Sequence, residues 1–409
     1  MSTSTIATPA IERDLASAIP NWNSRRAKLA GRMQHVRVCH LSPVQRTRDE
    51  RAFTRESLPA TGYGLELAIV GPHSLTGKVD RVEFVAVPTS RNRLMRVLLF
   101  FRMVSQGLKQ RADIYHVHSP ELIPAGLALK LFFRKRVVYD SREDFPSMML
   151  TKAYLPARLR KPMSWVVAQF EKLAARYLDA VVTADSGSLR PLARTGRSKK
   201  LVFYNFPNLK FFPRTETSEK SYELVYRGGL SERAGTFVLL EAVRLLADSG
   251  MPPRLLLFGY TDNPESKRKI VDVLISLGIE NLVTLRGTIP HEAMARTLSE
   301  ARIAVCPLQQ IPKFMNNIPV KVFESWACGL PVIATDLPPI RPFFQHEGLG
   351  LLVKPGDPKD LANAIRRLLA APELMEEYGR RARQVVLQRY NSSMEIHKLV
   401  SLYGEVLAC

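Results

Sequence analysis

Short apolar runs separated by helix-length segments recur along the first half of the chain. The runs lie at residues 36–41, 65–70, 82–87, 114–118, 137–139 and 180–183. Buried strands that alternate with helices are typical of a parallel sheet that is covered on both faces. The pattern therefore predicts a first α/β domain.

The same alternation starts again after a polar stretch that contains proline. The strands expected in this second part lie at 223–226, 254–258, 282–285, 303–307, 331–334 and 350–353. The boundary falls between Pro207 and Ser221, where Pro213 and residues 215–220 interrupt the pattern. We therefore expect an α/β protein with four consecutive parts: a flexible extension (1–34), a Rossmann-like domain (35–209), a second Rossmann-like domain (210–390), and a helix that packs back on the first domain (391–409).

The composition is that of a globular protein. With 46% hydrophobic and 24% charged residues among 409, the chain can bury sizeable cores, which excludes disorder throughout. Its four cysteines form no Cys-x-x-Cys pair, so neither a disulfide framework nor a structural zinc site is indicated, and a reducing compartment fits. No run of eighteen uncharged apolar residues exists, and residues 1–34 lack the apolar core of a secretory signal. We expect a cytoplasmic location.

The positive charge is concentrated in the first half of the chain. The formal net charge is +21, with 34 basic and 16 acidic residues in 1–209 against 25 and 22 in 210–409. Such a balance indicates an anionic partner for the first half: nucleic acid, an anionic membrane surface or a phosphorylated substrate.

A glycine-rich segment at 228–235 joins an expected strand to an expected helix. Glycine lets the backbone approach a ligand closely, and a helix N-terminus beside Arg233 is suited to a diphosphate. The alternative is a tight strand-to-helix turn with a solvated arginine.

A second segment, 316–334, combines an expected helix with a buried strand. Pro319 can start the helix, Lys321 would lie in its first turn, and Glu324 would follow one turn later. A carboxylate there could accept hydrogen bonds from a ribose diol, and the lysine could meet phosphate. The alternative is an amphipathic helix with a Glu–Lys pair on its wet face.

The string Asn-x-x-Pro-x-Lys-x-Phe-Glu at 316–324, followed by Ala-Cys-Gly-Leu-Pro-Val-Ile-Ala, resembles the donor-binding segment of family 4 glycosyltransferases. Segments similar to that family in order and spacing also lie at 49–53, 62–63, 115–124, 138–146 and 204–208. The resemblance spans about residues 36–390. It implies the GT-B architecture, two facing Rossmann-like domains with a cleft between them, and transfer from a nucleotide sugar with retention of the anomeric configuration.

The resemblance also implies a role for each matching residue. Glu324 would bind the ribose of the donor, while Lys321 and Arg233 would hold the diphosphate, and His118 would face the donor sugar. The catalytic residues would then be His118, Lys321 and Arg233. The further donor-binding residues would be Gly228, Gly229, Gly259, Gly287 and Asn316. Simple turn geometry is the alternative for the glycines, and a structural histidine beside a buried strand is the alternative for His118.

The chain departs from the family pattern at several positions. Ala234 stands where a basic residue is usual, and Asn316 stands where an acid is common. Ser119 replaces an aspartate and Arg142 replaces a histidine on the expected acceptor side, which also includes Glu121 and Glu143. The two acceptor-side departures, Ser119 and Arg142, predict either a different acceptor, for example one with more negative charge, or a weakened catalyst.

The resemblance implies a reaction without a metal ion, and we find no Asp-x-Asp strand end that would bind one. Retention by double displacement needs a carboxylate below the anomeric carbon. Glu121, Glu143 and Asp144 are available, but each is equally explained as a solvent-facing or helix-capping residue. We therefore expect front-face substitution, in which the diphosphate oxygen takes the acceptor proton and cationic side chains stabilise the developing charge. No cofactor is expected.

Two segments of the basic half suggest where the acceptor binds. Basic residues flank aromatic and aliphatic ones at 91–102 and again at 158–170. Such segments suit helices that lie on an anionic bilayer, where a lipid-diphosphate-linked sugar would be presented. The alternative is that the apolar residues are core and the charges are solvated.

Three classes of function compete. The first is a retaining glycosyltransferase that acts on a glycan or lipid-linked acceptor in the synthesis of a surface polysaccharide or glycolipid. The second is a GT-B protein that binds a nucleotide sugar but has lost turnover, as Ser119, Arg142 and Ala234 would suggest. The third is a nucleic-acid-binding protein, which rests on charge alone; no recognisable nucleic-acid module accompanies that charge, so no nucleic acid is expected.

Overall fold

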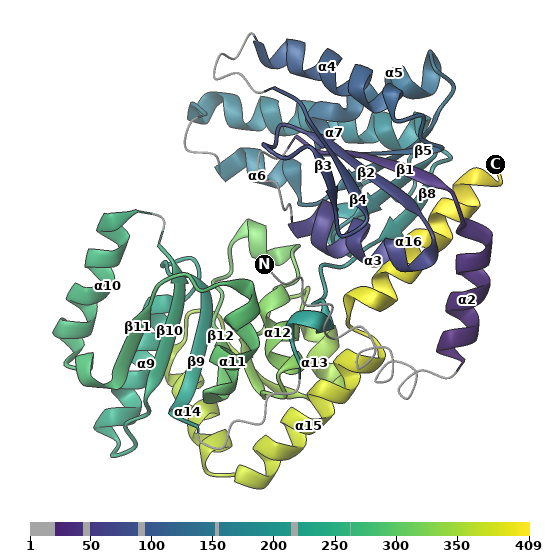
Figure 1. Ribbon diagram of the computed structural model, residues 1–409. Coiled ribbons are helices and arrows are strands. Elements are labelled where there is room, and N and C mark those ends of the chain that lie inside the picture. The colour runs from purple at the N-terminus through teal and green to yellow at the C-terminus, as the bar shows by residue number, and fades with distance from the viewer. Residues whose placement is uncertain (1–20, 44–49, 89–94, 152–154, 214–219, 262) are drawn as a thin grey trace. The chain divides into compact units, whose positions relative to one another are not determined.

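The computed structural model describes residues 21–43, 50–88, 95–151, 155–213, 220–261 and 263–409 (Figure 1). These residues form two compact units. The N-terminal unit consists of residues 21–205 together with 392–409, and the C-terminal unit consists of residues 206–391. The chain thus returns to its first unit at the end.

The described part of the N-terminal unit contains an eight-stranded sheet with the strand order β3-β4-β2-β1-β5-β6-β7-β8. All neighbouring strands are parallel except β3, which pairs antiparallel with β4. The strands are β1 Arg37–Leu41, β2 Glu66–Gly71, β3 Gly77–Val79, β4 Val82–Ala86, β5 Ile114–His118, β6 Arg136–Ser141, β7 Ala180–Thr183 and β8 Lys199–Val202. The order reverses between β1 and β5, and ligands of open α/β sheets bind at such a switch point.

Helices cover both faces of this sheet (Figure 1). They are α2 Trp22–Met33, α3 Leu58–Ala60, α4 Met95–Lys109, α5 Ile123–Leu131, α6 Phe145–Thr151, α7 Ala157–Tyr177, α8 Ser186–Leu189 and α16 Ser392–Leu407. A π-helical segment, Glu50–Ser57, precedes α3. Because side chains alternate along a strand, Val38 packs into one core and Cys39 into the core on the other face.

The helix α16 closes the first of these cores. Leu399, Val400 and Tyr403 are fully or almost fully buried there, together with Val38 and Phe53. In Figure 1, α16 lies beside α2, at the two ends of the colour scale. Residues far apart in sequence therefore share one core.

The expectation of a flexible extension over residues 1–34 is wrong for its second half. Residues 1–20 lie outside the described residues, but Trp22–Met33 form the helix α2. Trp22 and Met33 are buried, and the Trp22 ring lies 5.4 Å from the His397 ring of α16. The helix α16, which is remote in sequence, thus supplies the packing contact that stabilises the polar helix α2.

The C-terminal unit contains, in its described residues, a six-stranded parallel sheet with the order β11-β10-β9-β12-β13-β14. Its strands are β9 Tyr222–Gly229, β10 Leu255–Tyr260, β11 Val283–Arg286, β12 Ala301–Cys306, β13 Val332–Thr335 and β14 Gly350–Val353. Its helices are α9 Thr236–Asp248, α10 Pro264–Leu277, α11 Met294–Ser299, α12 Val320–Ala327, α13 Arg341–Glu347, α14 Pro358–Leu369 and α15 Pro372–Gln388. The switch point lies between β9 and β12, which brings the segments that follow these two strands together.

Candidate functional site

The segment after β9 turns tightly into α9, and its glycines are needed for backbone packing. A Cβ atom on Gly235, whose φ is 77°, would lie 1.7 Å from the carbonyl oxygen of Pro307, after β12. A Cβ atom on Gly259, in β10, would lie 1.8 Å from the carbonyl oxygen of Gly228. Both glycines therefore allow neighbouring strand ends to approach closely. This is the turn geometry that the sequence offered as the alternative to ligand binding. Gly287, after β11, faces open space.

Lys321 lies against the end of β9. Its ammonium donates a hydrogen bond to the Tyr226 hydroxyl at 3.1 Å and lies 4.5 Å above the Tyr226 ring. A Cβ atom on Gly228 would come within 2.9 Å of the ammonium, and the φ of 137° at this position itself favours glycine. Burial acts to lower the pKa of Lys321, but Tyr226 and Cys306 more than offset it, so the pKa lies above its ordinary value. The group is a fixed positive charge beside the glycine turn.

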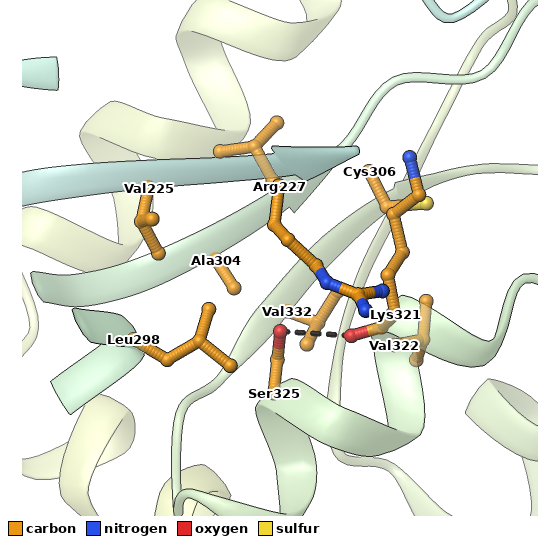
Figure 2. Close-up of a pocket in the computed structure, with 10 residues that line it drawn as sticks. Val225, Arg227, Leu298, Ala304, Cys306, Lys321, Val322, Ser325 and Val332 are labelled. Atoms are coloured by element: carbon orange, nitrogen blue, oxygen red, sulfur yellow. Dashed lines mark hydrogen bonds between the residues drawn. The ribbon is translucent and has the colours of Figure 1, made fainter. Parts of the chain in front are cut away.

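Glu324 lies one turn after Lys321 on α12, as the sequence predicts, and is buried. Its Oε2 is 2.5 Å from Nη1 of Arg227, the β9 residue before Gly228. Figure 2 shows the Arg227 guanidinium directed at the start of α12, while the Lys321 side chain extends toward Cys306. The cavity between these side chains is only about 10 Å³, room for at most one water. The small cavity therefore cannot itself hold a nucleotide.

A larger, open cavity of about 710 Å³ lies beside the glycine turn. That volume is within the range of ligand sites. Its lining comes from three loops: Ser231, Glu232, Arg233, Gln309, Gln310, Ile311 and Pro355. Arg233 is exposed there, and its carbonyl accepts a hydrogen bond from the Gln309 amide. Arg233 is thus presented to a cavity large enough for a ligand, although Lys321 and Glu324 do not line it.

The turn before α12 carries the two asparagines. Asn316 ends the short helix Pro312–Met315, and Asn317 follows it. The Oδ1 atom of Asn317 is buried without a hydrogen bond from the described residues. A buried acceptor of this kind is satisfied when a donor from a ligand reaches it. Sequence reasoning considered Asn316 and did not consider Asn317.

His118 lies at the end of β5 and is fully buried inside the N-terminal unit. Its Nδ1 is 2.8 Å from Oδ2 of Asp140, on β6, and its Nε2 is 2.9 Å from Nδ1 of His40, on β1. Arg51 donates to both carboxylate oxygens of Asp140, at 2.6 and 2.7 Å. Because Arg51 and His118 both favour the ionised carboxylate, the pKa of Asp140 lies well below its ordinary value despite burial. The His118 imidazole is thus held within a polar network.

The network extends to a third histidine. His116 is two residues before His118 on the same face of β5, and its Nδ1 is 2.7 Å from the Tyr403 hydroxyl of α16. Burial and the neighbouring imidazoles hold the pKa values of His40 and His116 well below the ordinary histidine value, so both rings are neutral at pH 7. Sequence reasoning missed the roles of Arg51, His40 and His116. The period-two alternation of strands β1 and β5 was the signal available.

The expected acceptor-side residues lie near the ends of β5 and β6. Ser119 is buried with φ at 77°, a conformation that costs energy for a residue other than glycine and that recurs at functional sites. Glu121 is exposed on the following turn, while Arg142 and Glu143 are half-buried after β6. The four residues thus occupy two loops that follow neighbouring strands.

Glu171, on α7, was not considered from the sequence. Its Oε1 accepts hydrogen bonds from Ser141 at 2.5 Å and from Tyr139 at 2.9 Å, both on β6. Burial raises the pKa of Glu171 to about 7, because the carboxylate loses its hydration. Through its hydrogen bonds to β6, the Glu171 carboxyl group therefore supports the loop after this strand, which carries Arg142 and Glu143.

The helix α7 carries apolar side chains on its outer surface. An exposed stripe at helical spacing consists of Leu159, Met163, Phe170, Leu173 and Tyr177. Trp165 beside the stripe is 65% exposed, and Phe132 after α5, the helix that packs against α7, is 80% exposed. Basic residues flank the stripe: Arg158, Arg160, Lys161, Lys172 and Arg176. These apolar residues are therefore not core. In the other basic segment, Arg91 and Arg93 lie outside the described residues.

None of the helices in the described part of the chain combines the length and hydropathy needed to span a bilayer.

Comparison with known proteins shows what the C-terminal unit is similar to. Residues 208–385 match the family model of glycosyl transferases group 1. The amylovoran biosynthesis glycosyltransferase AmsK of Erwinia amylovora is 34% identical over 141 residues, which are 34% of this chain and 34% of that protein. The chain spans 13–45% of the length of this and three further curated relatives.

Solved structures match both units. Sucrose-phosphate synthase from Thermosynechococcus elongatus superposes with a TM-score of 0.72 at 19% identity, over 91% of this chain and 100% of that one. Anabaena Alr3699/HepE, solved in complex with UDP and glucose, superposes with a TM-score of 0.69 at 15% identity and the same coverage. The chain thus has the GT-B fold, with two Rossmann-like α/β units, and its C-terminal unit matches glycosyl transferases group 1.

Proposed function

We propose that the protein is a retaining glycosyltransferase that takes a sugar from a nucleotide-sugar donor. The observation that carries the proposal is the arrangement around α12. A buried carboxylate, Glu324, and a fixed ammonium, Lys321, lie one turn apart on this helix, beside the glycine turn at the end of β9. The group 1 match covers the same residues, and the related HepE structure holds UDP.

The proposed roles follow from the chemistry of each group. Glu324 accepts hydrogen bonds from the ribose hydroxyls and is oriented by Arg227. Lys321 and Arg233 neutralise the diphosphate as the bond to the sugar breaks, which is the charge that grows in the transition state. These cations make a metal ion at the diphosphate unnecessary, so we propose metal-independent transfer by front-face substitution. His118, held by Asp140 and His40, acts as a positioning residue near the acceptor loops.

We further propose a lipid-linked or glycan acceptor that is met at an anionic membrane surface on its cytoplasmic face. The exposed apolar stripe on α7 with its flanking arginines and lysines supports this proposal. Apolar side chains of an interfacial helix enter the headgroup region, and basic residues beside them add electrostatic attraction. The relative AmsK, whose name places it in amylovoran biosynthesis, supports a role in building a surface polysaccharide.

The first test is a thermal-shift screen against UDP, GDP, ADP, TDP and their common sugars. A ligand that binds the folded state raises its apparent stability, so one nucleotide should give a selective shift. Lys321→Met should abolish most of the shift, whereas Lys267→Met, at an exposed site on α10, should keep it. No shift with any nucleotide would contradict donor binding. A shift without sugar transfer or donor hydrolysis would support a binding protein that has lost turnover.

A further inference from the structure

Four buried side chains of the N-terminal unit converge where its sheet reverses order. His40 on β1 and His116 on β5 stand opposite each other in the strand register, His118 follows on the same face of β5, and Glu56 comes from the π-helical segment. Each exposes at most 1% of its surface. One donor atom from each lies within 4.8 Å of all the others. The proposed contacts to the donor lie in the C-terminal unit, and of this group only His118 enters the proposed function, as a positioning residue.

The four donor atoms lie close enough together to surround one ion: Nδ1 of His40 and Nε2 of His118 are 2.9 Å apart, and no two of the four atoms are more than 4.8 Å apart. Oε2 of Glu56 is 3.6 Å from Nδ1 of His40 and 3.8 Å from both Nδ1 of His116 and Nε2 of His118. These distances are too long for hydrogen bonds. Zinc bonds of about 2.0–2.1 Å place tetrahedral ligands about 3.3 Å apart. The three Glu56 separations would have to shorten by a few tenths of an ångström, while His40 and His118 would move apart and the widest pair would have to close further.

The surrounding contacts orient the same atoms. Asp140 lies 2.8 Å from Nδ1 of His118, which places the proton there and leaves a lone pair on Nε2. Arg51 contacts Oε1 of Glu56 at 3.0 Å and so leaves Oε2 directed to the imidazoles. A carboxylate behind a ligating histidine is the usual outer contact of zinc sites. The two carboxylates, Glu56 and Asp140, offset the positive charges of Arg51 and of Arg142, which also acts on His40.

We propose that His40, His116, His118 and Glu56 bind one divalent transition-metal ion, with zinc as the preferred species. Three imidazoles and one carboxylate favour zinc over magnesium or calcium. All four positions are protein ligands and the site is closed to solvent, so the ion is structural: it ties the π-helical segment to β1 and β5. Binding replaces the close contact between His40 and His118 and displaces the Tyr403 hydroxyl from His116.

The test uses the full-length chain without an affinity tag, stripped with a chelator and then reloaded with Zn²⁺ or Co²⁺. Elemental analysis after gel filtration should give about one ion per chain. Co²⁺ should give the ligand-field absorption of a tetrahedral site with nitrogen and oxygen donors. Addition of Zn²⁺ should raise the melting temperature of the stripped protein. These readouts on the unmodified sequence need neither activity nor a variant.

Variants then assign the ion to these residues. His116→Gln and His40→Gln should lower metal affinity by more than the roughly 10–100-fold that the loss of an outer contact costs, because a ligand itself is lost. The matched control is His73→Gln, a buried histidine of the same unit that contacts the Ile69 carbonyl outside the cluster. Less than about 0.1 ion per reloaded chain, or no ligand-field absorption, would overturn the proposal and leave a hydrogen-bonded network only. Equal metal content in folded His116→Gln would likewise overturn it.

Discussion

The Glu324 carboxylate is buried against Arg227, and this pairing determines what its removal should do. Glu324→Gln keeps the size of the side chain but removes the charge that a ribose diol would bind. The loss of a hydrogen bond to a charged group costs about 1.5–3 kcal/mol. We expect donor affinity, measured by calorimetry, to fall roughly tenfold to a hundredfold. Glu241→Gln, at an exposed position on α9, is the control. An unchanged affinity in Glu324→Gln would refute the ribose contact.

Glu171 should make stability depend on pH. Its folded pKa, about 7, lies above the ordinary value of 4.5, so the folded state binds the proton more tightly. The stabilisation is complete below pH 4.5 and is lost as the pH rises through 7, by about 3 kcal/mol in all. Glu171→Gln keeps an oxygen for Ser141 and Tyr139 and removes this dependence.

The measurement is the free energy of unfolding of the N-terminal unit at pH 5 and at pH 8. Relative to the natural protein, Glu171→Gln should gain stability as the pH rises, whereas Glu66→Gln, at an exposed site, should not. Parallel pH profiles for Glu171→Gln and the natural protein would show that Glu171 titrates at its ordinary pKa.

At the scale of single residues, the sequence shows which side chains could take part in binding or catalysis, but not which side chains they contact. Lys321 and Glu324 could be predicted because helical spacing puts them on one face of α12. Arg227 could not, since its contact depends on how β9 packs against that helix. His118 could be singled out by resemblance, but its ties to Arg51 and Asp140 join three separate segments. Local patterns do not carry such distant pairings.

The turn between β9 and α9 offers a test at the scale of elements. Gly235 and Gly250 have nearly the same φ, 77° and 79°, but only a Cβ on Gly235 would meet backbone, while Gly250 has open space. Gly250→Ala should cost about 1–2 kcal/mol from the left-handed conformation alone. Gly235→Ala should cost about 2–5 kcal/mol, because overpacking adds to the strain.

Chemical denaturation of both variants measures this difference. Gly235→Ala should also weaken donor binding, since the turn must shift away from Pro307. Equal destabilisation by the two substitutions would mean that the close approach of the β12 end is not what requires glycine at position 235.

The apolar stripe on α7 predicts how the protein meets membranes. Burial of a large apolar side chain is worth about 1.5–3 kcal/mol, so Trp165→Ser should lower binding to anionic vesicles at least about tenfold. Binding should also weaken with salt, because the flanking arginines and lysines contribute electrostatically.

Ile275→Ser is the matched control for the vesicle experiment. Ile275 is 59% exposed, on α10 of the C-terminal unit, and its loss should leave vesicle sedimentation unchanged. Equal binding to neutral and anionic vesicles, or equal losses in both variants, would argue against a specific membrane face on α7.

The central strands were easier to predict than the edge strands of the first sheet and the helix α2. The apolar runs locate the central strands of both sheets within a few residues, because burial on both faces leaves a continuous hydrophobic signal. The edge strands β3 and β8 were missed, since their side chains are half-buried or exposed and lysines interrupt the apolar pattern. The helix α2 was missed because its stabilising contacts come from α16.

At the scale of the whole molecule, the chain returns to its first unit through α16. The stability of the N-terminal unit should therefore be open to change without loss of donor binding, which is assigned to the C-terminal unit. Leu399 of α16 is fully buried in the N-terminal core, although the preceding residues 206–391 belong to the other unit. Leu399→Ala should destabilise the N-terminal unit by about 2–5 kcal/mol, because it leaves a cavity. Leu131→Ala, at a 61% exposed position, should cost little.

Calorimetric unfolding with and without the selected nucleotide separates the two units, because a chain with two units need not unfold in one step. Leu399→Ala should lower the transition of the N-terminal unit and leave the nucleotide-dependent shift of the C-terminal unit intact. The ion-pair partner of Glu324, Arg227, and the hydrogen-bond partner of Lys321, Tyr226, both lie on β9 of the C-terminal unit, which is why the shift should survive. If the same substitution also abolished the nucleotide shift, the donor site would depend on the N-terminal core, and the assignment of donor binding to residues 206–391 alone would have to be abandoned.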